Sequence, residues 1–161
     1  MIFSDILFDE SIISNLLRLN EDIALVVDSS FPIHRHAMDK ELDLVVARQS
    51  DQYYRAPSVT SGPELAFIGS KIKRDIATHE FIGIAKFSEY GADNLITVYK
   101  DCLKRHKGRF HESPTVEQAS INDVIEEMIE RAFKVHSLET HKGWMEIHNK
   151  KDYEMAKKIV N

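Results

Sequence analysis

Cysteine is scarce in this chain of 161 residues, and long apolar runs are absent. The single cysteine, Cys102, has no partner for an internal disulfide, which is typical of a protein from a reducing compartment. No apolar run approaches the roughly 20 residues of a membrane-spanning helix, and no basic stretch followed by an apolar one resembles a secretory signal. We therefore expect a cytoplasmic protein without a membrane partner, in which Cys102 is a packed free thiol on a helix.

Basic residues are also fewer than acidic residues. The sequence has 21 Lys and Arg against 26 Asp and Glu, which gives a net charge of −5 with histidine neutral. A nucleic-acid-binding surface needs a basic patch or stripe, so we expect no nucleic-acid partner. Hydrophobic residues make up 43% of the chain, which is enough for one core of ordinary size. The sequence thus predicts a single domain over residues 1–161.

Glycine is both scarce and scattered. A glycine-rich loop is the usual means by which backbone N–H groups cradle nucleotide phosphates. The six glycines form no such loop and stand apart as Gly62, Gly69, Gly83, Gly91, Gly108 and Gly143. The sequence therefore contains no recognisable phosphate cradle.

The order of the apolar segments is typical of an α/β fold. Strands are predicted at residues 2–8, 22–27, 42–47, 64–72, 81–87, 134–138 and 144–147. Helices are predicted after Asp9, Ser88, Ser120 and Asn149, each of which can cap a helix. Since strands and helices alternate, and since the predicted strand 22–27 is apolar at every position after Asp22, we expect a mixed, mostly parallel sheet with flanking helices. Gly83 inside its strand indicates a bend or the close approach of another segment.

A lone carboxylate, Asp5, follows the first apolar residues of the chain. At the carboxyl edge of a sheet, an aspartate can hold Mg²⁺ together with substrate phosphates. Asp5 could equally be a turn or helix-capping residue, because aspartate is common before helices. Spacing alone leaves both interpretations open.

The segment 142–148 (KGWMEIH) combines an aromatic residue with polar residues at a short strand. Glu146 or His148 could face a ligand, because α/β sheets build their sites at such edges. The alternative is a surface turn in which Trp144 packs in the core.

A second acidic residue, Glu80, directly precedes the strand 81–87 and could bind a cationic group, assisted by a cation–π contact with Trp144. The alternative for Glu80 is a solvated strand edge.

The remaining histidines and glutamates favour simpler interpretations. Of the eight histidines, His34 and His36 form the tightest pair, but their spacing on a loop is a weak metal motif. Glu126, Glu127 and Glu130 are most simply the solvated face of a helix. A metal-dependent hydrolase built on histidines is therefore the least favoured function.

Four segments occur in an order that resembles a known family. They are residues 4–9 (SDILFD), 22–28 (DIALVVD), 80–88 (EFIGIAKFS) and 143–148 (GWMEIH), followed by Asp152 and Tyr153. The series resembles the C-terminal half of nucleotidyltransferases of the sugar-phosphate type. It is most similar to the branch that activates phosphocholine or phosphonates with CTP, which includes domains fused to phosphoenolpyruvate mutase. The resemblance spans nearly the whole chain.

The resemblance implies a partial Rossmann-like fold and transfer of a nucleotidyl, here cytidylyl, group from an NTP to a small phospho- or phosphono-alcohol, with release of pyrophosphate. It implies that Asp5 ligates Mg²⁺ and that His148 occupies the position of the second metal carboxylate. Glu80 matches an acidic position that touches the acceptor in related enzymes. With Trp144 and Glu146, it forms the expected set of acceptor-binding residues.

Two departures from the family pattern change the expected activity. A neutral imidazole is a poor Mg²⁺ ligand, so His148 should weaken Mg²⁺ binding or shift it toward Mn²⁺. The glycine-rich NTP loop of the family's N-terminal half has no counterpart here, and no residue is assigned to the chemical step. We therefore expect a fragment or truncated homologue that needs a separate N-terminal half and is inactive alone. The alternative is a non-catalytic binding or assembly module that retains the fold.

The resemblance also predicts an interface. In the family, the strand matched by residues 2–8 lies beside strands of the N-terminal half, so without them its edge would be open. Open strand edges tend to pair with another chain. We therefore expect Ile2, Phe3, Ile6 and Leu7 at a homodimer or partner interface.

Overall fold

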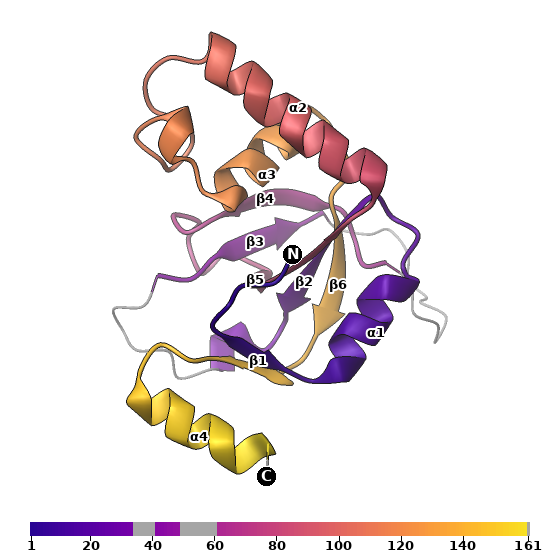
Figure 1. Cartoon of the computed structure of the whole chain (residues 1–161), viewed down its shortest axis with the longest axis vertical. Helices are drawn as coiled ribbons and strands as arrows, with labels where there is room; N and C mark the ends of the chain where they lie inside the picture. Colours follow the sequence, from indigo (N-terminus) through magenta and orange to yellow (C-terminus); the bar gives the residue numbers. More distant parts are fainter. Residues whose placement is uncertain (34–40, 49–60, 161) are drawn as a thin grey trace.

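The computed structural model describes residues 1–33, 41–48 and 61–160, and it has a mixed α/β architecture (Figure 1). The strands are β1 (Ile6–Phe8), β2 (Ile23–Asp28), β3 (Leu44–Ala47), β4 (Leu65–Gly69), β5 (His79–Phe87), β6 (His136–Thr140) and β7 (Trp144–Glu146). The helices are α1 (Glu10–Arg18), α2 (Glu89–Arg105), α3 (Ile121–Glu130) and α4 (Lys150–Val160), with short 3-10 turns η1 (Phe31–Ile33) and η2 (Val116–Gln118). The predicted class is confirmed, while the pair His34 and His36 lies outside the described residues.

The main sheet has five strands in the order β4-β3-β5-β2-β6. β2 runs parallel to β6, whereas β4–β3, β3–β5 and β5–β2 are antiparallel. The sheet is mixed, as predicted, but the expectation that parallel pairs dominate is wrong for the described residues. The reason is that no helix is described between β3, β4 and β5, and parallel neighbours need a long crossover connection.

Both faces of the main sheet are covered, which explains the continuous apolar run of β2. All six residues of β2 are buried. Leu25 and Val27 belong to the core that includes residues of α2 and α3, whereas Ala24 and Val26 belong to the core that includes residues of α1. Figure 1 shows α2 and α3 lying together and apart from α1. Successive side chains of a strand point to opposite faces, so each face of β2 fills a different core.

The predicted helix starts are confirmed by their hydrogen bonds. The Asp9 carboxylate accepts the N–H of Ser11 at 2.9 Å in front of α1. Ser88 caps α2, and Ser120 forms a reciprocal capping box with Asp123 in front of α3. Each cap satisfies N–H groups that a helix leaves open in its first turn. These local signals fix where the helices that flank the sheet begin.

The segment predicted as one strand over 2–8 is divided in two. Ile2 bridges Ile84 of β5, and the Phe3 N–H donates to the Gly83 carbonyl at 3.0 Å. After a turn, β1 pairs antiparallel with β7 in a separate two-stranded sheet. The segment is therefore paired at two places and is more covered than expected. Ile2 is 48% exposed, whereas the other three predicted interface residues are half-buried, and the predicted interface stays a prediction.

Gly83 permits the contact between the N-terminal segment and β5. Its φ is +78°, and a Cβ at this position would collide with the ring of Phe3. That ring packs edge-on against Phe81 with the ring centroids 5.9 Å apart. The predicted close approach at Gly83 is thus confirmed, and Phe3 is the residue that approaches.

Two predictions that concern helices can also be checked. Cys102 is a buried free thiol on α2, as predicted. Burial, followed by the charge of Glu127, raises the pKa of this thiol, which disfavours the reactive thiolate. Among the described residues, no helix is both long and apolar enough to cross a membrane.

Candidate functional site

Two buried carboxylates lie side by side at one end of the main sheet. The strand register places Asp28, the last residue of β2, opposite Glu80 on β5 and opposite Thr140 on β6. Asp28 is 0% exposed and Glu80 is 2% exposed. Residues directly opposite each other on neighbouring strands project to the same face of the sheet. Because Glu80 is buried beside Asp28, the interpretation of Glu80 as a solvated strand-edge residue is wrong.

Asp28 is held by hydrogen bonds to both of its carboxylate oxygens. Oδ1 accepts the N–H groups of Ser30 at 2.8 Å and Lys142 at 3.2 Å. Oδ2 accepts the Ser30 hydroxyl at 2.9 Å and the Trp144 indole N–H at 2.8 Å. Burial by itself would raise the pKa of the Asp28 carboxyl, but the hydrogen bonds from Ser30, Trp144 and Lys142 outweigh it and lower the pKa. Asp28 therefore remains charged and joins the end of β2 to the turn before β7.

The hydrogen bond to Asp28 fixes the orientation of the Trp144 indole. Trp144 is half-buried and packs against the core that includes residues of α1. It also lines a hollow of about 580 Å³, together with Leu7, Phe8, Asp9, Glu10, Gly143 and Met145. Since the indole N–H is already bonded, the ring can meet a ligand only through its face or its carbon edge. Trp144 is thus both a core residue and a wall of the hollow.

Asp5, Glu146 and His148 come together where β1 pairs with β7. The register places Ile6 opposite Glu146, and the Ile147 N–H donates to the Asp5 carbonyl at 2.7 Å. Asp5 Oδ2 lies 3.8 Å from His148 Nδ1, and Glu146 Oε2 lies 3.0 Å from His148 Nε2. Asp5 lies in a turn and does not cap α1, which is capped by Asp9. Three residues predicted for the site are therefore neighbours, while their roles stay predictions.

The donor set of this group fits a softer divalent ion better than Mg²⁺. One carboxylate lies at each imidazole nitrogen, which is the usual arrangement when a carboxylate orients a metal-ligating histidine. Among the described residues, the group whose ligating atoms all lie within 4.8 Å of one another is His111, Glu127 and Glu130, and not this one. A metal ion here would therefore be held by Asp5 and by Nδ1 of His148, with Glu146 at the other nitrogen. One carboxylate and one imidazole suit Mn²⁺ better than Mg²⁺.

Asp28 is the polar residue that sequence reasoning missed. Its segment, 22–28, contributed to the family resemblance, but no role was predicted for its last residue. A carboxylate that directly continues a wholly apolar run must either reach solvent or find buried donors. The place of Asp28 directly after an apolar run was therefore the signal in the sequence. Its hydrogen-bond donors are Ser30 and residues more than a hundred positions later, and spacing along the chain cannot reveal such distant partners.

Comparison with solved structures shows a fold of the nucleotidyltransferase type. The structure of the inositol-1-phosphate CTP transferase from T. maritima matches 98% of this chain with a TM-score of 0.59 and 16% sequence identity. This chain covers 54% of that structure, so it spans about half of its length. No family model and no curated protein matches the sequence. At this identity the similarity concerns the fold alone.

Proposed function

We propose that this chain forms the metal- and acceptor-binding side of a nucleotidyltransferase that transfers a cytidylyl group to a small phospho- or phosphono-alcohol. The observation that carries the proposal is the meeting of Asp5, Glu146 and His148 at the end of the short sheet that contains Trp144. The similarity of the fold to a CTP transferase supports the reaction class.

The proposed reaction needs positioning and charge neutralisation more than covalent help from the protein. A phosphate or phosphonate oxygen of the acceptor attacks the α-phosphorus of CTP. A new P–O bond forms, the bond from the α-phosphorus to the oxygen bridging to the β-phosphorus breaks, and pyrophosphate leaves. Both reactants are anionic, and a bound divalent cation would supply the neutralising charge between them.

Each residue of the candidate site then has a distinct role. Asp5 and Nδ1 of His148 hold the cation, while Glu146 accepts from Nε2 and fixes the imidazole tautomer. Asp28 is a positioning residue, because its carboxylate holds the Trp144 ring. Trp144 presents its ring face to the apolar or cationic group of the acceptor. Glu80, next to Asp28, would accept a hydrogen bond from the ammonium group of an acceptor.

The nucleotide phosphates require donors that the scattered glycines do not provide. We therefore expect the chain by itself to bind a cation and an acceptor without turning over CTP. A second segment or chain would have to supply the phosphate cradle.

Titration calorimetry with Mn²⁺ and Mg²⁺ tests the metal part of the proposal. The unmodified chain should bind Mn²⁺ more tightly than Mg²⁺. Asp5→Asn should weaken Mn²⁺ binding at least about tenfold, and His148→Asp should reverse the preference toward Mg²⁺, because hard carboxylate oxygens suit Mg²⁺. Asp93→Asn, at an exposed residue of α2 outside the proposed ligand set, is the control. Equal Mn²⁺ binding by the unmodified chain and Asp5→Asn would refute the assignment.

Calorimetry with phosphocholine, 2-aminoethylphosphonate and inositol 1-phosphate tests the acceptor part. We expect Trp144→Phe to retain most of the affinity and Trp144→Ala to lose it. Pyrophosphate release from CTP should remain at the blank rate with the chain alone, and robust release would contradict the expected lack of a phosphate cradle.

A non-catalytic binding module is the second candidate function. His148 at the second metal position and the absence of a glycine-rich loop favour it. Acceptor binding that needs no divalent cation and survives Asp5→Asn would support this alternative over the transferase.

A further inference from the structure

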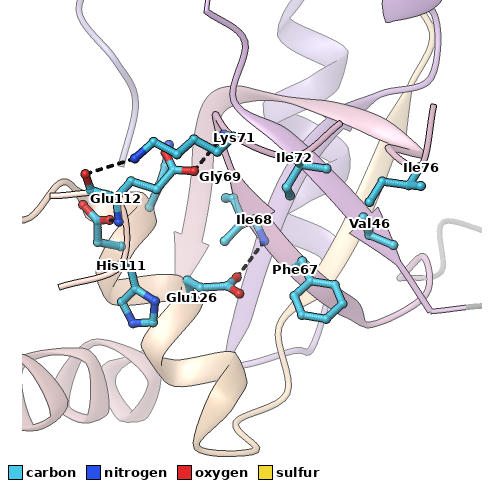
Figure 2. Close-up of a pocket in the computed structure, with 12 residues that line it drawn as sticks. Val46, Phe67, Ile68, Gly69, Lys71, Ile72, Ile76, His111, Glu112 and Glu126 are labelled. Atoms are coloured by element: carbon cyan, nitrogen blue, oxygen red, sulfur yellow. Dashed lines mark hydrogen bonds between the residues drawn. The ribbon is translucent and has the colours of Figure 1, made fainter. Parts of the chain in front are cut away.

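A second hollow, of about 380 Å³, lies between α3 and the edge strand β4 (Figure 2). We call it the α3–β4 hollow, and we define it by Val46, Phe67, Ile72, Ile76, Asn122 and Glu126. It shares no lining residue with the hollow beside Trp144. Its size falls within the range of small-molecule sites.

Glu126 provides a carboxylate on the polar wall of this hollow. Glu126 Oε2 accepts the Ile68 N–H at 2.7 Å (Figure 2), which saturates a donor on the edge strand β4. Burial raises the pKa of the Glu126 carboxyl, and its hydrogen bond with Ile68 only partly opposes this. Glu126 and Glu127 are both half-buried, so the interpretation of them as a solvated helix face is wrong, and Glu130 alone of the three is exposed.

The two basic side chains that line this hollow, Lys71 and His111, have other partners. The Lys71 ammonium donates to the Glu112 carbonyl at 3.4 Å, and the Lys71 N–H donates to the Glu112 carboxylate at 2.8 Å. His111 Nε2 lies 3.0 Å from Glu127 Oε2. In the described parts of the chain, Glu126 has no ion-pair partner of its own. Among the described residues, the Glu126 carboxyl is therefore not neutralised by a basic side chain of its own.

Asn122 adds an acceptor to the same wall. Its Oδ1 is buried and has no hydrogen-bond partner among the described residues. A buried acceptor without a donor costs about 1–3 kcal/mol. Asn122 and Glu126 therefore both place acceptor groups on this wall.

The opposite wall is apolar and open to solvent. Phe67 is 54% exposed and Ile76 is 58% exposed, and Val46 and Ile72 lie beside them in the close-up (Figure 2). Large apolar side chains gathered at the rim of a hollow mark a binding surface more often than singly scattered ones do. The apolar wall thus complements the hydrocarbon part of a ligand.

We propose that the α3–β4 hollow binds a small organic cation, namely a primary amine that carries an aryl or alkyl group. The ammonium donates to the Glu126 carboxylate, and the hydrocarbon group covers Phe67 and Ile76. The proposal does not depend on nucleotidyl transfer, because no residue of the candidate site takes part.

The test compares three probes of similar shape and different charge: 2-phenylethylamine, 2-phenylethanol and 3-phenylpropionate. Titrations followed by ¹H–¹⁵N NMR should shift the amide signals of Ile68 and Gly69 with the amine. The neutral alcohol should bind at least about tenfold more weakly, because a charge-assisted hydrogen bond is replaced by a neutral one. The anion should not bind.

Two variants separate binding from folding. Glu126→Gln keeps an oxygen that can accept the Ile68 N–H but removes the charge, so it should fold normally and weaken amine binding about tenfold. Phe67→Ala should also weaken binding, and its exposure makes a folding defect unexpected. Ile96→Ala, at an exposed apolar residue of α2 outside the hollow, should leave binding unchanged.

Three results would overturn the proposal: no shift at Ile68 with the amine, equal binding of amine and alcohol, or unchanged amine binding by folded Glu126→Gln. Asp5→Asn should bind the amine normally. A failure of the metal and acceptor experiments would therefore not change the result expected for amine binding.

Discussion

The indole N–H of Trp144 donates to Oδ2 of Asp28 over 2.8 Å, although 116 positions separate the two residues in the chain. This bond connects the buried end of β2 with the short sheet that contains Glu146 and is flanked by Asp5 and His148. The orientation of Trp144, and with it the shape of the hollow that it lines, therefore depends on a carboxylate in the interior of the main sheet.

Asp28→Asn should lower the free energy of unfolding by about 2–3 kcal/mol, because the amide turns an NH₂ group toward buried donors that had bound the carboxylate. Trp144→Phe removes one donor and keeps most of the apolar packing, so it should cost only about 1 kcal/mol. Urea denaturation followed by circular dichroism measures both values. A smaller cost for Asp28→Asn than for Trp144→Phe would contradict the role of Asp28 as the centre of this network.

Low pH should destabilise the fold, because it protonates the hydrogen-bonded carboxylates of Asp28 and Asp123. At Asp28, burial would raise the pKa, but the hydrogen bonds from Ser30, Trp144 and Lys142 lower it. At Asp123, burial would raise the pKa, but hydrogen bonds from Ser113, from Ser120 and from the Glu112 N–H lower it. A carboxyl with a lowered folded pKa contributes stability that is present above the unfolded pKa and lost as the pH falls through the folded pKa. The free energy of unfolding should thus decline below about pH 4, the unfolded value for aspartate.

Denaturant titrations between neutral pH and about pH 2 check this, since that range spans the aspartate titration. Asp123→Asn should be less stable at neutral pH and should show a shallower acid decline, whereas Asp93→Asn on the exposed side of α2 should keep the original slope. An acid decline that is unchanged in Asp123→Asn would assign the effect to other carboxyls.

Most of the regular elements could be predicted from the sequence because their causes are local. Asp9, Ser88 and Ser120 signal helix starts through hydrogen bonds to the next few residues, and the apolar run of β2 signals burial on both faces. The C-terminal end of α3 was harder to predict. The helix ends at Glu130, and Ala132 adopts a φ of +63°, a conformation that alanine gives no reason to expect.

The candidate site was only partly predictable, because its contacts join distant segments. The polar residues around Trp144 were identified by their strand-edge positions, which are readable along the chain. The pairing of β1 with β7, which brings Asp5 to His148, depends on tertiary structure. Asp28 and the burial of Glu126 depend on partners far away in sequence, so neither periodicity nor spacing could indicate them.

Gly83→Ala should be among the most damaging single-methyl changes in the chain. A φ of +78° costs an alanine about 1–2 kcal/mol, and the collision with the Phe3 ring adds about 1–3 kcal/mol. Gly108→Ala is the matched control, since Gly108 has a φ of +86° but nothing within 4 Å of an added Cβ. Thermal and urea unfolding should give a loss of about 1–2 kcal/mol for the control, from its φ alone. Equal losses at the two glycines would show that the Phe3 contact contributes nothing.

Residues 1–3 form a strand edge that can promote self-association. The Phe3 N–H and the Met1 carbonyl bond to β5, at Gly83 and Ala85 respectively, so alternation along the strand turns the N–H and C=O of Ile2 to the other side. Ile2 is also 48% exposed. In the parts of the chain that the structure describes, no strand pairs with this side of Ile2, and such an edge with an apolar side chain favours pairing with a second chain. We therefore expect a homodimer at high protein concentration.

Ile2→Lys should weaken this dimer about tenfold or more, because burial of the isoleucine side chain contributes about 1.5 kcal/mol or more and a lysine opposes strand pairing at an edge. Leu17→Lys is the control, since Leu17 is 68% exposed on α1, away from the edge. Light scattering over a concentration series measures the dissociation constant of each form. A clean monomer for the unmodified chain, or a dimer that Leu17→Lys weakens as strongly as Ile2→Lys, would place the interface elsewhere.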